Sequence, residues 1–170
     1  MSALPVSKPT LKLVLIVDDI EENRELLERA LRSSGYETIS AASGREALSI
    51  ISKQVPDLVL LDWMMPQLSG LDTLRAIREL HPCSRLPVVM CTAVGEEMSV
   101  VAAIGAGAND YITKPISIPI LRARMTALFD QMAVIDALDT GKSEAERRLL
   151  ERTRSMLGGA NYVGRADRQP

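Results

Sequence analysis

Five polar residues of this chain stand at the ends of short aliphatic runs, where a buried strand would leave a protein core. Asp18 and Asp19 end one run, and Asp62 ends a second, "LVLL". Thr92 ends a third run, and Lys114 lies just beyond a fourth. Carboxylates that lie close together repel one another, and their pKa values rise unless a cation compensates them. A hard divalent ion such as Mg²⁺ is the natural partner, because it takes a few oxygen ligands and keeps several waters.

The same five residues could catalyse the transfer of a phosphoryl group. Lys114 would supply a positive donor to phosphoryl oxygens, and Thr92 would supply a neutral hydrogen bond. Together with a divalent ion, they would stabilise the charge on a phosphoryl group in transfer. Asp62 would then be the nucleophile and would form an acyl phosphate. Taken singly, Asp62 could be a turn residue, and Asp18 with Asp19 a helix cap; only the set favours the chemistry.

Aliphatic runs alternate with helical patterns along the chain, which is typical of a parallel sheet covered by helices on both faces. The predicted fold is therefore α/β, a (βα)5 doubly wound parallel sheet. In such sheets ligands bind beyond the carboxyl ends of the strands, so we expect the five polar residues to meet at one edge. The predicted strands are Lys12–Val17, Glu37–Ala41, Leu58–Leu61, Val88–Cys91 and Asp110–Ile112. The predicted helices are Glu22–Arg32, Ser43–Gln54, Leu71–Leu80 and Ser99–Ile104, with a last helix from Ile118.

The last predicted helix is longer than a helix that only covers the sheet. Over residues 118–135, apolar side chains recur at alternating spacings of three and four, the heptad pattern of a coiled coil. We expect "LDTG" at 138–141 to end this helix, and Ser143 with Glu146 to cap a second one. The pattern could reflect an ordinary amphipathic helix, but residues 132–138 have no sheet left to cover. They favour dimerisation or a rigid signalling helix.

These patterns divide the chain into four segments. They are an N-terminal arm at 1–11, a globular domain at 12–130, a helical extension at 131–157 and a Gly-rich tail at 158–170 that we expect to be disordered. The charge distribution also sets the end of the chain apart. Residues 1–140 hold 13 basic and 18 acidic side chains, a net charge of −5, whereas residues 141–170 hold 7 and 4, a net charge of +3.

The bulk composition excludes several classes of protein. Lysine and arginine total 20 against 22 acidic residues, and this near balance argues against a nucleic-acid-binding or membrane-adsorbed protein. The longest early apolar run is too short to cross a membrane, and the N-terminus lacks a secretory signal, so we expect a soluble cytoplasmic protein. Cys83, Cys91 and the single histidine, His81, are too few for a disulfide framework or a zinc site. We interpret the cysteines as free thiols and His81 as a surface residue.

Four segments carry a resemblance to a known family. They are "VLIVDD" at 14–19, "LLDWMMPQLSG" at 60–70, "VVMCTA" at 88–93 and "AGANDYITKP" at 106–115. In order and spacing they resemble the receiver domain of two-component response regulators, over roughly residues 12–130. The resemblance implies a flavodoxin-like fold with strand order 2-1-3-4-5. It also implies that the chain accepts a phosphoryl group from a histidine kinase or a histidine phosphotransfer protein.

The resemblance implies a role for each residue of the site. Asp62 would be the phosphoacceptor, and Lys114, joined to Pro115 by a cis peptide, would contact the phosphoryl oxygens. Thr92 and Tyr111 would be the switch pair: the hydroxyl turns toward the phosphoryl group and the aromatic ring moves inward. Tyr111 could also be a half-buried packing residue with a solvated hydroxyl. The implied Mg²⁺ ligands are the carboxylates of Asp19 and Asp62, that of Asp18 mainly through water, and the backbone carbonyl of Met64.

Two positions that adjust the phosphoryl lifetime in this family are occupied by Met64 and Val94. Neither side chain can orient an attacking water by hydrogen bonding, so we expect slow self-dephosphorylation. We interpret Trp63, Met64 and Met65 as loop residues packed around the site rather than as a cofactor-binding motif.

The sequence therefore predicts a phosphorylation-controlled switch that catalyses only its own Mg²⁺-dependent phosphorylation and dephosphorylation. Its expected partners are a kinase or phosphotransfer protein, a downstream effector protein or domain, and a second copy of the chain bound through the last helix. The chain would act alone or form the N-terminal part of a longer regulator. The alternative is a metal-dependent aspartyl-phosphate hydrolase, but the acids at the first strand are adjacent, whereas that class usually has a DxD pair. A scaffold that has lost the chemistry is disfavoured by the complete set of acids, hydroxyl and lysine.

Overall fold

Five parallel strands form one sheet in the order β2-β1-β3-β4-β5. The structure, a computed structural model, describes residues 11–93 and 97–158; for 97–99 and 153–158 it describes the backbone alone. The strands are β1 (Leu13–Val17), β2 (Glu37–Ala41), β3 (Leu58–Asp62), β4 (Val88–Thr92) and β5 (Asp110–Thr113). The helices are α1 (Glu21–Arg32), α2 (Gly44–Lys53), α3 (Gly70–Leu80), α4 (Glu97–Gly105) and α5 (Ile118–Gly158). The predicted α/β class, flavodoxin-like topology and strand order are confirmed.

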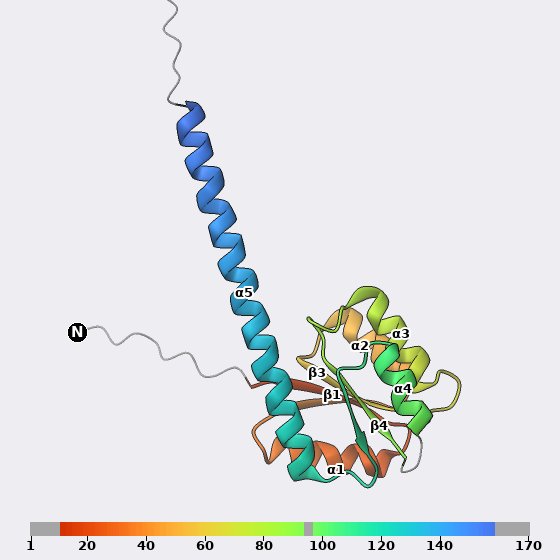
Figure 1. Cartoon of the computed structure of the whole chain (residues 1–170). Helices are drawn as coiled ribbons and strands as arrows, with labels where there is room; N and C mark the ends of the chain where they lie inside the picture. The colour runs from red at the N-terminus through yellow and green to blue at the C-terminus, as the bar shows by residue number, and fades with distance from the viewer. Residues whose placement is uncertain (1–10, 94–96, 159–170) are drawn as a thin grey trace, which may run out of the picture. The chain divides into compact units, whose positions relative to one another are not determined.

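Helices cover both faces of the sheet because successive strand residues point to opposite sides. In β1, Leu15 and Val17 pack in one hydrophobic cluster, and Val14 and Ile16 in the other. The first cluster includes residues of α2, α3 and α4, and the second includes residues of α1 and of the beginning of α5. Figure 1 shows α1 and the beginning of α5 on one side of the sheet, with α2, α3 and α4 on the other.

Three strands continue one residue beyond their predicted ends. Asp62, Thr92 and Thr113 are the last residues of β3, β4 and β5. Asp62 pairs with Cys91, and the following amide of Trp63 donates a 2.9 Å hydrogen bond to the Cys91 carbonyl. The apolar runs predicted the strands up to the first polar side chain, but backbone ladders depend on peptide groups rather than on side-chain polarity. The polar residues are thus held by the sheet itself.

Helix α5 is one continuous element of 41 residues. The prediction that "LDTG" at 138–141 would end it, and that Ser143 and Glu146 would cap a second helix, is wrong. A single glycine costs a helix only about 1 kcal/mol relative to alanine, and no proline interrupts this stretch. The Thr140 hydroxyl is satisfied within the helix, since it donates to the Asp136 carbonyl at 2.8 Å.

The chain divides into two compact units, residues 1–130 and 131–170. The first contains the sheet and α5 up to Asp130; the described part of the second is the remainder of α5. The expected arm at 1–11 and tail at 158–170 lie almost entirely outside the described residues. Within the residues described, no helix is both long and apolar enough to cross a membrane.

Candidate functional site

The strands deliver the predicted polar residues to one edge of the sheet. Asp18 directly follows β1, Asp62 ends β3 and Thr92 ends β4. Lys114 directly follows β5, and its amide donates a 2.7 Å hydrogen bond to the Thr92 carbonyl. The expected cis peptide between Lys114 and Pro115 is present. These residues meet because the carboxyl ends of parallel strands share one edge.

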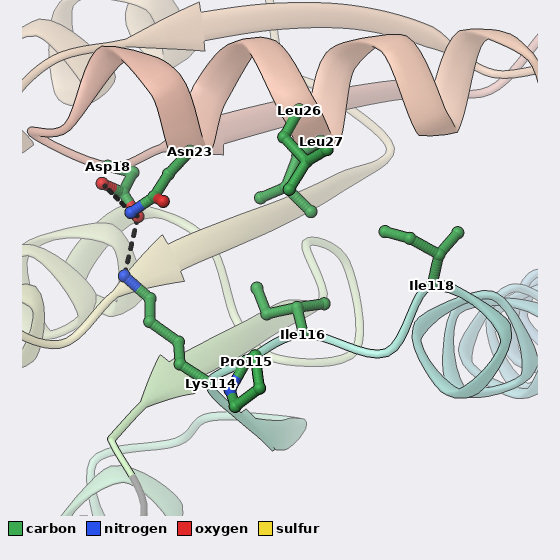
Figure 2. Close-up of a pocket in the computed structure, with 8 residues that line it drawn as sticks. All are labelled: Asp18, Asn23, Leu26, Leu27, Lys114, Pro115, Ile116 and Ile118. Carbon is green, nitrogen blue, oxygen red and sulfur yellow. Dashed lines mark hydrogen bonds and ion pairs between the residues drawn. The ribbon is translucent and has the colours of Figure 1, made fainter.

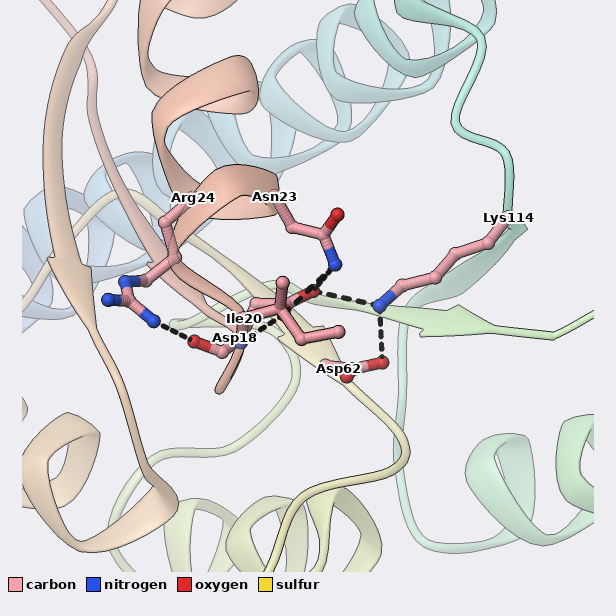
Figure 3. A network of polar contacts seen from close by, with 6 residues as sticks. All are labelled: Asp18, Ile20, Asn23, Arg24, Asp62 and Lys114. Atoms are coloured by element: carbon pink, nitrogen blue, oxygen red, sulfur yellow. Dashed lines mark hydrogen bonds and ion pairs between the residues drawn. The ribbon is translucent and has the colours of Figure 1, made fainter.

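Lys114 joins two of the carboxylates. Its Nζ lies 2.8 Å from Asp18 Oδ2 (Figure 2) and 2.9 Å from Asp62 Oδ1 (Figure 3). Both carboxylates are buried, and the lysine side chain is only partly exposed. Ion pairs between buried groups are screened less than surface pairs. One ammonium therefore compensates part of the charge of two acids.

Asp18 accepts hydrogen bonds from several neighbours. Its Oδ1 accepts from the Ile20 amide at 2.9 Å, and Asn23 Nδ2 lies 3.1 Å from both carboxylate oxygens. Arg24 donates to the Asp18 carbonyl at 2.7 Å (Figure 3). The sequence reasoning missed Asn23 and Arg24, although both stand in the first turn of a predicted helix, one turn beyond the acid. The alternative that Asp18 and Asp19 cap α1 is not supported, because the cap residue is Ile20, with no side-chain cap bond.

Three carboxylates could hold a metal ion. Asp18, Asp19 and Asp62 each offer an oxygen, and these oxygens all lie within 4.8 Å of one another. Asp18 and Asp62 are buried, whereas Asp19 is exposed. The donors are all oxygens, and the exposed side leaves room for water, which fits Mg²⁺. Three negative charges beside one lysine also leave an excess that a divalent cation would compensate.

Burial raises the pKa of the Asp62 carboxyl. The hydrogen bond and charge of Lys114 act in the opposite direction, the charge of Asp18 raises the pKa further, and a backbone hydrogen bond from Met64 lowers it. For Lys114, burial lowers the pKa, but its hydrogen bonds and ion pairs with Asp18 and Asp62 outweigh burial and raise it. Asp62 thus depends on its positive surroundings to stay ionised, the form that a nucleophile requires.

Thr92 and Tyr111 lie on neighbouring strands near the site. The Thr92 Oγ1 is buried and, among the described residues, has no hydrogen-bond partner. A buried hydroxyl without a partner costs about 1–3 kcal/mol, so this group is ready to pair with an incoming oxygen. Tyr111 is half-buried and packs against the first hydrophobic cluster.

The loop after β3 turns back tightly over the end of the strand. A Cβ at Gly70 would collide with the backbone carbonyl of Asp62, so only glycine permits this approach. Gly70 donates its amide to the Trp63 carbonyl at 3.0 Å. Met65 and Trp63 pack against the core as expected, but the Met64 side chain does not, since it is 66% exposed. The sequence patterns did not indicate a role for Gly70, because its close contact with the Asp62 backbone depends on tertiary structure.

A pocket of about 170 Å³ opens beside Asp18 and Lys114 (Figure 2). Its other lining residues are Asn23, Leu26, Leu27, Pro115, Ile116 and Ile118. Leu26 is 52% exposed. The core takes Leu27 and Leu31 instead, and Leu26 gives the site an apolar border.

The two cysteines and the histidine add no ligand to the carboxylate cluster within the described residues. Cys83 is an exposed free thiol and Cys91 a buried one, as interpreted. Burial raises the pKa of Cys91 to about 12, so this thiol is protonated and inert. His81 follows α3 as its C-cap residue, and its carbonyl accepts a hydrogen bond from Arg78. Val94 lies outside the described residues.

Comparison with known proteins gives consistent matches. Residues 14–126 match the model of the family described as response regulator receiver domain. The phosphate regulon transcriptional regulatory protein PhoB of Pseudomonas aeruginosa is 41% identical over 117 residues, 69% of this chain and 51% of that protein. The response regulator PleD of Caulobacter vibrioides is 36% identical over 134 residues, 79% of this chain and 30% of that protein. The chain spans about half the length of the first curated relatives that it matches.

Solved structures give the same match at the level of the fold. A putative response regulator from Chloroflexus aurantiacus has a TM-score of 0.66 and 38% identity, covering 70% of this chain and 98% of that one. NtrX from Brucella abortus has a TM-score of 0.71 and 30% identity, covering 76% of this chain and 29% of that one.

Proposed function

Because the chain belongs to the response regulator receiver domain family, we propose that it accepts a phosphoryl group on Asp62 and thereby switches partner binding or oligomerisation. The donor would be a histidine kinase or a histidine phosphotransfer protein. The observation that carries the proposal is the contact of Lys114 with both Asp18 and Asp62, beside the exposed Asp19. This set of groups suits a transferred phosphoryl group, which brings dispersed negative charge to the site.

In the proposed reaction, an Asp62 oxygen attacks the phosphorus of a phosphohistidine. The new P–O bond gives an acyl phosphate, the P–N bond breaks, and the electron pair returns to the imidazole nitrogen. The residues that would hold Mg²⁺ are Asp18, Asp19, Asp62 and the Met64 carbonyl. When bound, the ion neutralises charge on the transferring oxygens. Enzymatic activity is thus limited to the chain's own phosphorylation and dephosphorylation.

Lys114 would exchange one partner during this step. Its Nζ contacts Asp62 at 2.9 Å, and that carboxylate loses charge at one oxygen when the acyl phosphate forms. The ammonium would then pair with a phosphoryl oxygen while keeping its 2.8 Å contact with Asp18. The unpartnered Thr92 hydroxyl would donate to a second oxygen, and Tyr111 would move inward as the hydroxyl turns.

The apolar border of the site supports docking of a donor protein. Ile20, Leu26 and Pro115 are exposed, and Ile116 is half-buried beside them. An exposed apolar rim around a charged centre is typical of protein-binding surfaces. We propose that the phosphodonor protein packs on this rim. The exposed Met64 side chain cannot orient a water, which supports the proposed slow self-dephosphorylation.

We also propose a signalling role for α5 after Asp130. Val134, Leu138, Leu149 and Leu150 are each more than half exposed. A helix with exposed apolar residues favours association with a second copy or with an effector protein or domain. The greater length of the curated relatives supports a receiver that controls a further segment. We also propose that the protein acts in the cytoplasm.

The central proposal is tested by incubating the full chain with acetyl phosphate and Mg²⁺. We expect a phosphorylated species in the intact mass spectrum of the wild type and none for Asp62→Asn. Omitting Mg²⁺ should prevent phosphorylation. A folded wild type that takes no phosphoryl group would overturn the proposal. Multiple turnover of small phosphate esters would instead favour the hydrolase alternative.

A further inference from the structure

The ring of Tyr111 is covered by a charged residue from another element. The guanidinium carbon of Arg124, on α5, lies 5.9 Å from the centre of the Tyr111 ring. This separation is within the range of a cation–π contact, about 6 Å. Strand β5 is the edge strand of the sheet, so a side chain from α5 can reach around it.

Asp110 holds Arg124 in this position. Arg124 Nη1 lies 2.7 Å from Asp110 Oδ1 and 2.6 Å from Oδ2. Asp110 Oδ1 also accepts the backbone amide of Tyr111 at 2.8 Å. The same carboxylate therefore contacts the backbone of Tyr111 and the cation beside its ring. The Arg124 Nε is buried and, in the described part of the chain, has no hydrogen-bond partner, so the guanidinium is partly desolvated.

Packing alone does not enclose the ring. A pocket of about 260 Å³ lies next to Tyr111 and is lined also by Thr113, Pro115, Ile120 and Arg124. The side of the ring that faces this pocket is therefore not closely packed. The hydroxyl of Thr92, the other member of the proposed switch pair, has no hydrogen-bond partner among the described residues. The ring position is therefore held by packing against the first hydrophobic cluster on one side and by the Arg124 contact on the other.

We infer that Arg124 is a positioning residue for Tyr111: its contact with the ring stabilises the resting position and opposes the inward movement. The inference rests on the proposed function, because it assigns a regulator to the same switch. It also gives a physical link between the phosphorylation site and α5, since Arg124 belongs to that helix. A group that makes a stronger contact in one of two conformations shifts the population toward that conformation, and the shift is set by the difference between the two contact energies.

The size of the effect follows from the kind of contact. A partly exposed cation–π pair supports a population change of about two- to fivefold. Removing it should increase the fraction of chains with the ring inward by that factor. Affinity for a ligand that binds the inward state should rise by the same factor.

Beryllium trifluoride with Mg²⁺ is the probe, because it mimics a phosphoryl group on a carboxylate without covalent transfer. Binding to the full chain is followed by the fluorescence of Trp63, the single tryptophan, which adjoins Asp62. For Arg124→Gln we expect a dissociation constant about two- to fivefold below that of the wild type. Arg124→Lys keeps a cation, so its dissociation constant for the probe should be close to that of the wild type. Arg122→Gln, at an exposed position on the same helix, is the matched control and should not change the constant.

A double-mutant cycle separates this role from a general structural one. In a Tyr111→Leu background, Arg124→Gln should have no effect on probe affinity, because the ring is gone. In a Tyr111→Phe background, the effect should persist. The ring resonances of Tyr111, assigned by their loss in Tyr111→Leu, should shift in Arg124→Gln without probe toward their probe-bound positions in the wild type.

Equal probe affinity for Arg124→Gln and Arg122→Gln would overturn the inference, and so would an Arg124 effect that survives in Tyr111→Leu. Failure of the wild type to bind the probe would instead contradict the proposed function. The two failures are thus distinguishable in one titration series.

Discussion

The ammonium of Lys114 lies 2.9 Å from the carboxylate of Asp62, although one residue follows the edge strand β5 and the other ends the central strand β3. Both groups are largely withdrawn from water. The contact opposes the rise that burial causes in the Asp62 pKa and places a cation where a phosphoryl group would arrive. A single ion pair therefore serves both the resting carboxylate and the proposed transfer.

Replacing Lys114 by Met should slow phosphorylation by acetyl phosphate. Loss of a preorganised charge at a transferring group typically reduces the rate by about 10²-fold or more. The rate is measured by intact mass against time at fixed Mg²⁺. Lys12→Met is the matched control, since Lys12 forms an exposed 2.8 Å ion pair with Asp57. Equal rates for the two variants would show that Lys114 plays no catalytic part.

Asp62→Asn should stabilise the fold at neutral pH when Mg²⁺ is absent. Burial raises the Asp62 pKa, so the folded chain holds this proton more tightly than the unfolded chain. The contribution of Asp62 to stability then falls as pH rises from its ordinary pKa of 3.8 through the raised folded value. Because Asn carries no charge, the difference in free energy of unfolding between Asp62→Asn and the wild type should vanish below that pH window and be largest above it.

This prediction is checked by urea unfolding of both proteins across the acidic and neutral range. Asp130→Asn, at an exposed acid, is the control and should follow the wild type at each pH. A wild type more stable than Asp62→Asn above the window, without Mg²⁺, would contradict the assigned cost of burying this charge.

Mg²⁺ should raise the urea midpoint of the wild type, because an ion that binds only the folded state stabilises it. At a hundred times the dissociation constant, the gain is about 2.7 kcal/mol. Asp19→Asn should lose most of this gain while leaving the metal-free midpoint nearly unchanged, since Asp19 is exposed. Glu21→Gln, an exposed acid two residues later, should retain it. An undiminished Mg²⁺ effect in Asp19→Asn would remove this residue from the metal site.

Arg78→Ala should destabilise the first unit by about 2–4 kcal/mol, because loss of the guanidinium leaves acceptors without a partner in a site that is partly shielded from water. Arg78 donates to the carbonyls of Gly107 at 2.8 Å and Leu86 at 2.9 Å, and to Asn109 Oδ1 at 2.9 Å. Arg75 forms an exposed ion pair with Asp72, so Arg75→Ala should stay within about 0.5 kcal/mol of the wild type. Urea unfolding measures both, and similar losses would contradict the role of the buried network.

Ending the chain after Asp130 should abolish dimerisation if α5 mediates it. The exposed Leu138 and Leu149 lie beyond that point. Light scattering across a concentration series, before and after treatment with the phosphoryl mimic, compares the shortened and full chains. The full chain with Leu138→Ser is the second variant, and the same oligomeric state in all three would exclude this segment as the interface.

The sequence alone determined the α/β class, the position of each strand to within one residue at each end, and which polar residues meet at one edge of the sheet. Aliphatic runs specify buried parallel strands, and such strands carry their last residues to a common edge. Resemblance to the receiver family added the strand order, which the sheet confirms. These features depend on local patterns, so they could be read along the chain.

Tertiary structure alone decided the contacts that join distant segments. The support of Asp18 by Asn23, the approach of Gly70 to Asp62 and the cover of Tyr111 by Arg124 depend on how elements pack. The continuity of α5 through Gly141 has a local cause instead, because cooperative helix formation outweighs one unfavourable residue. Local patterns specify which residues end a strand; only packing specifies which neighbours then restrain them.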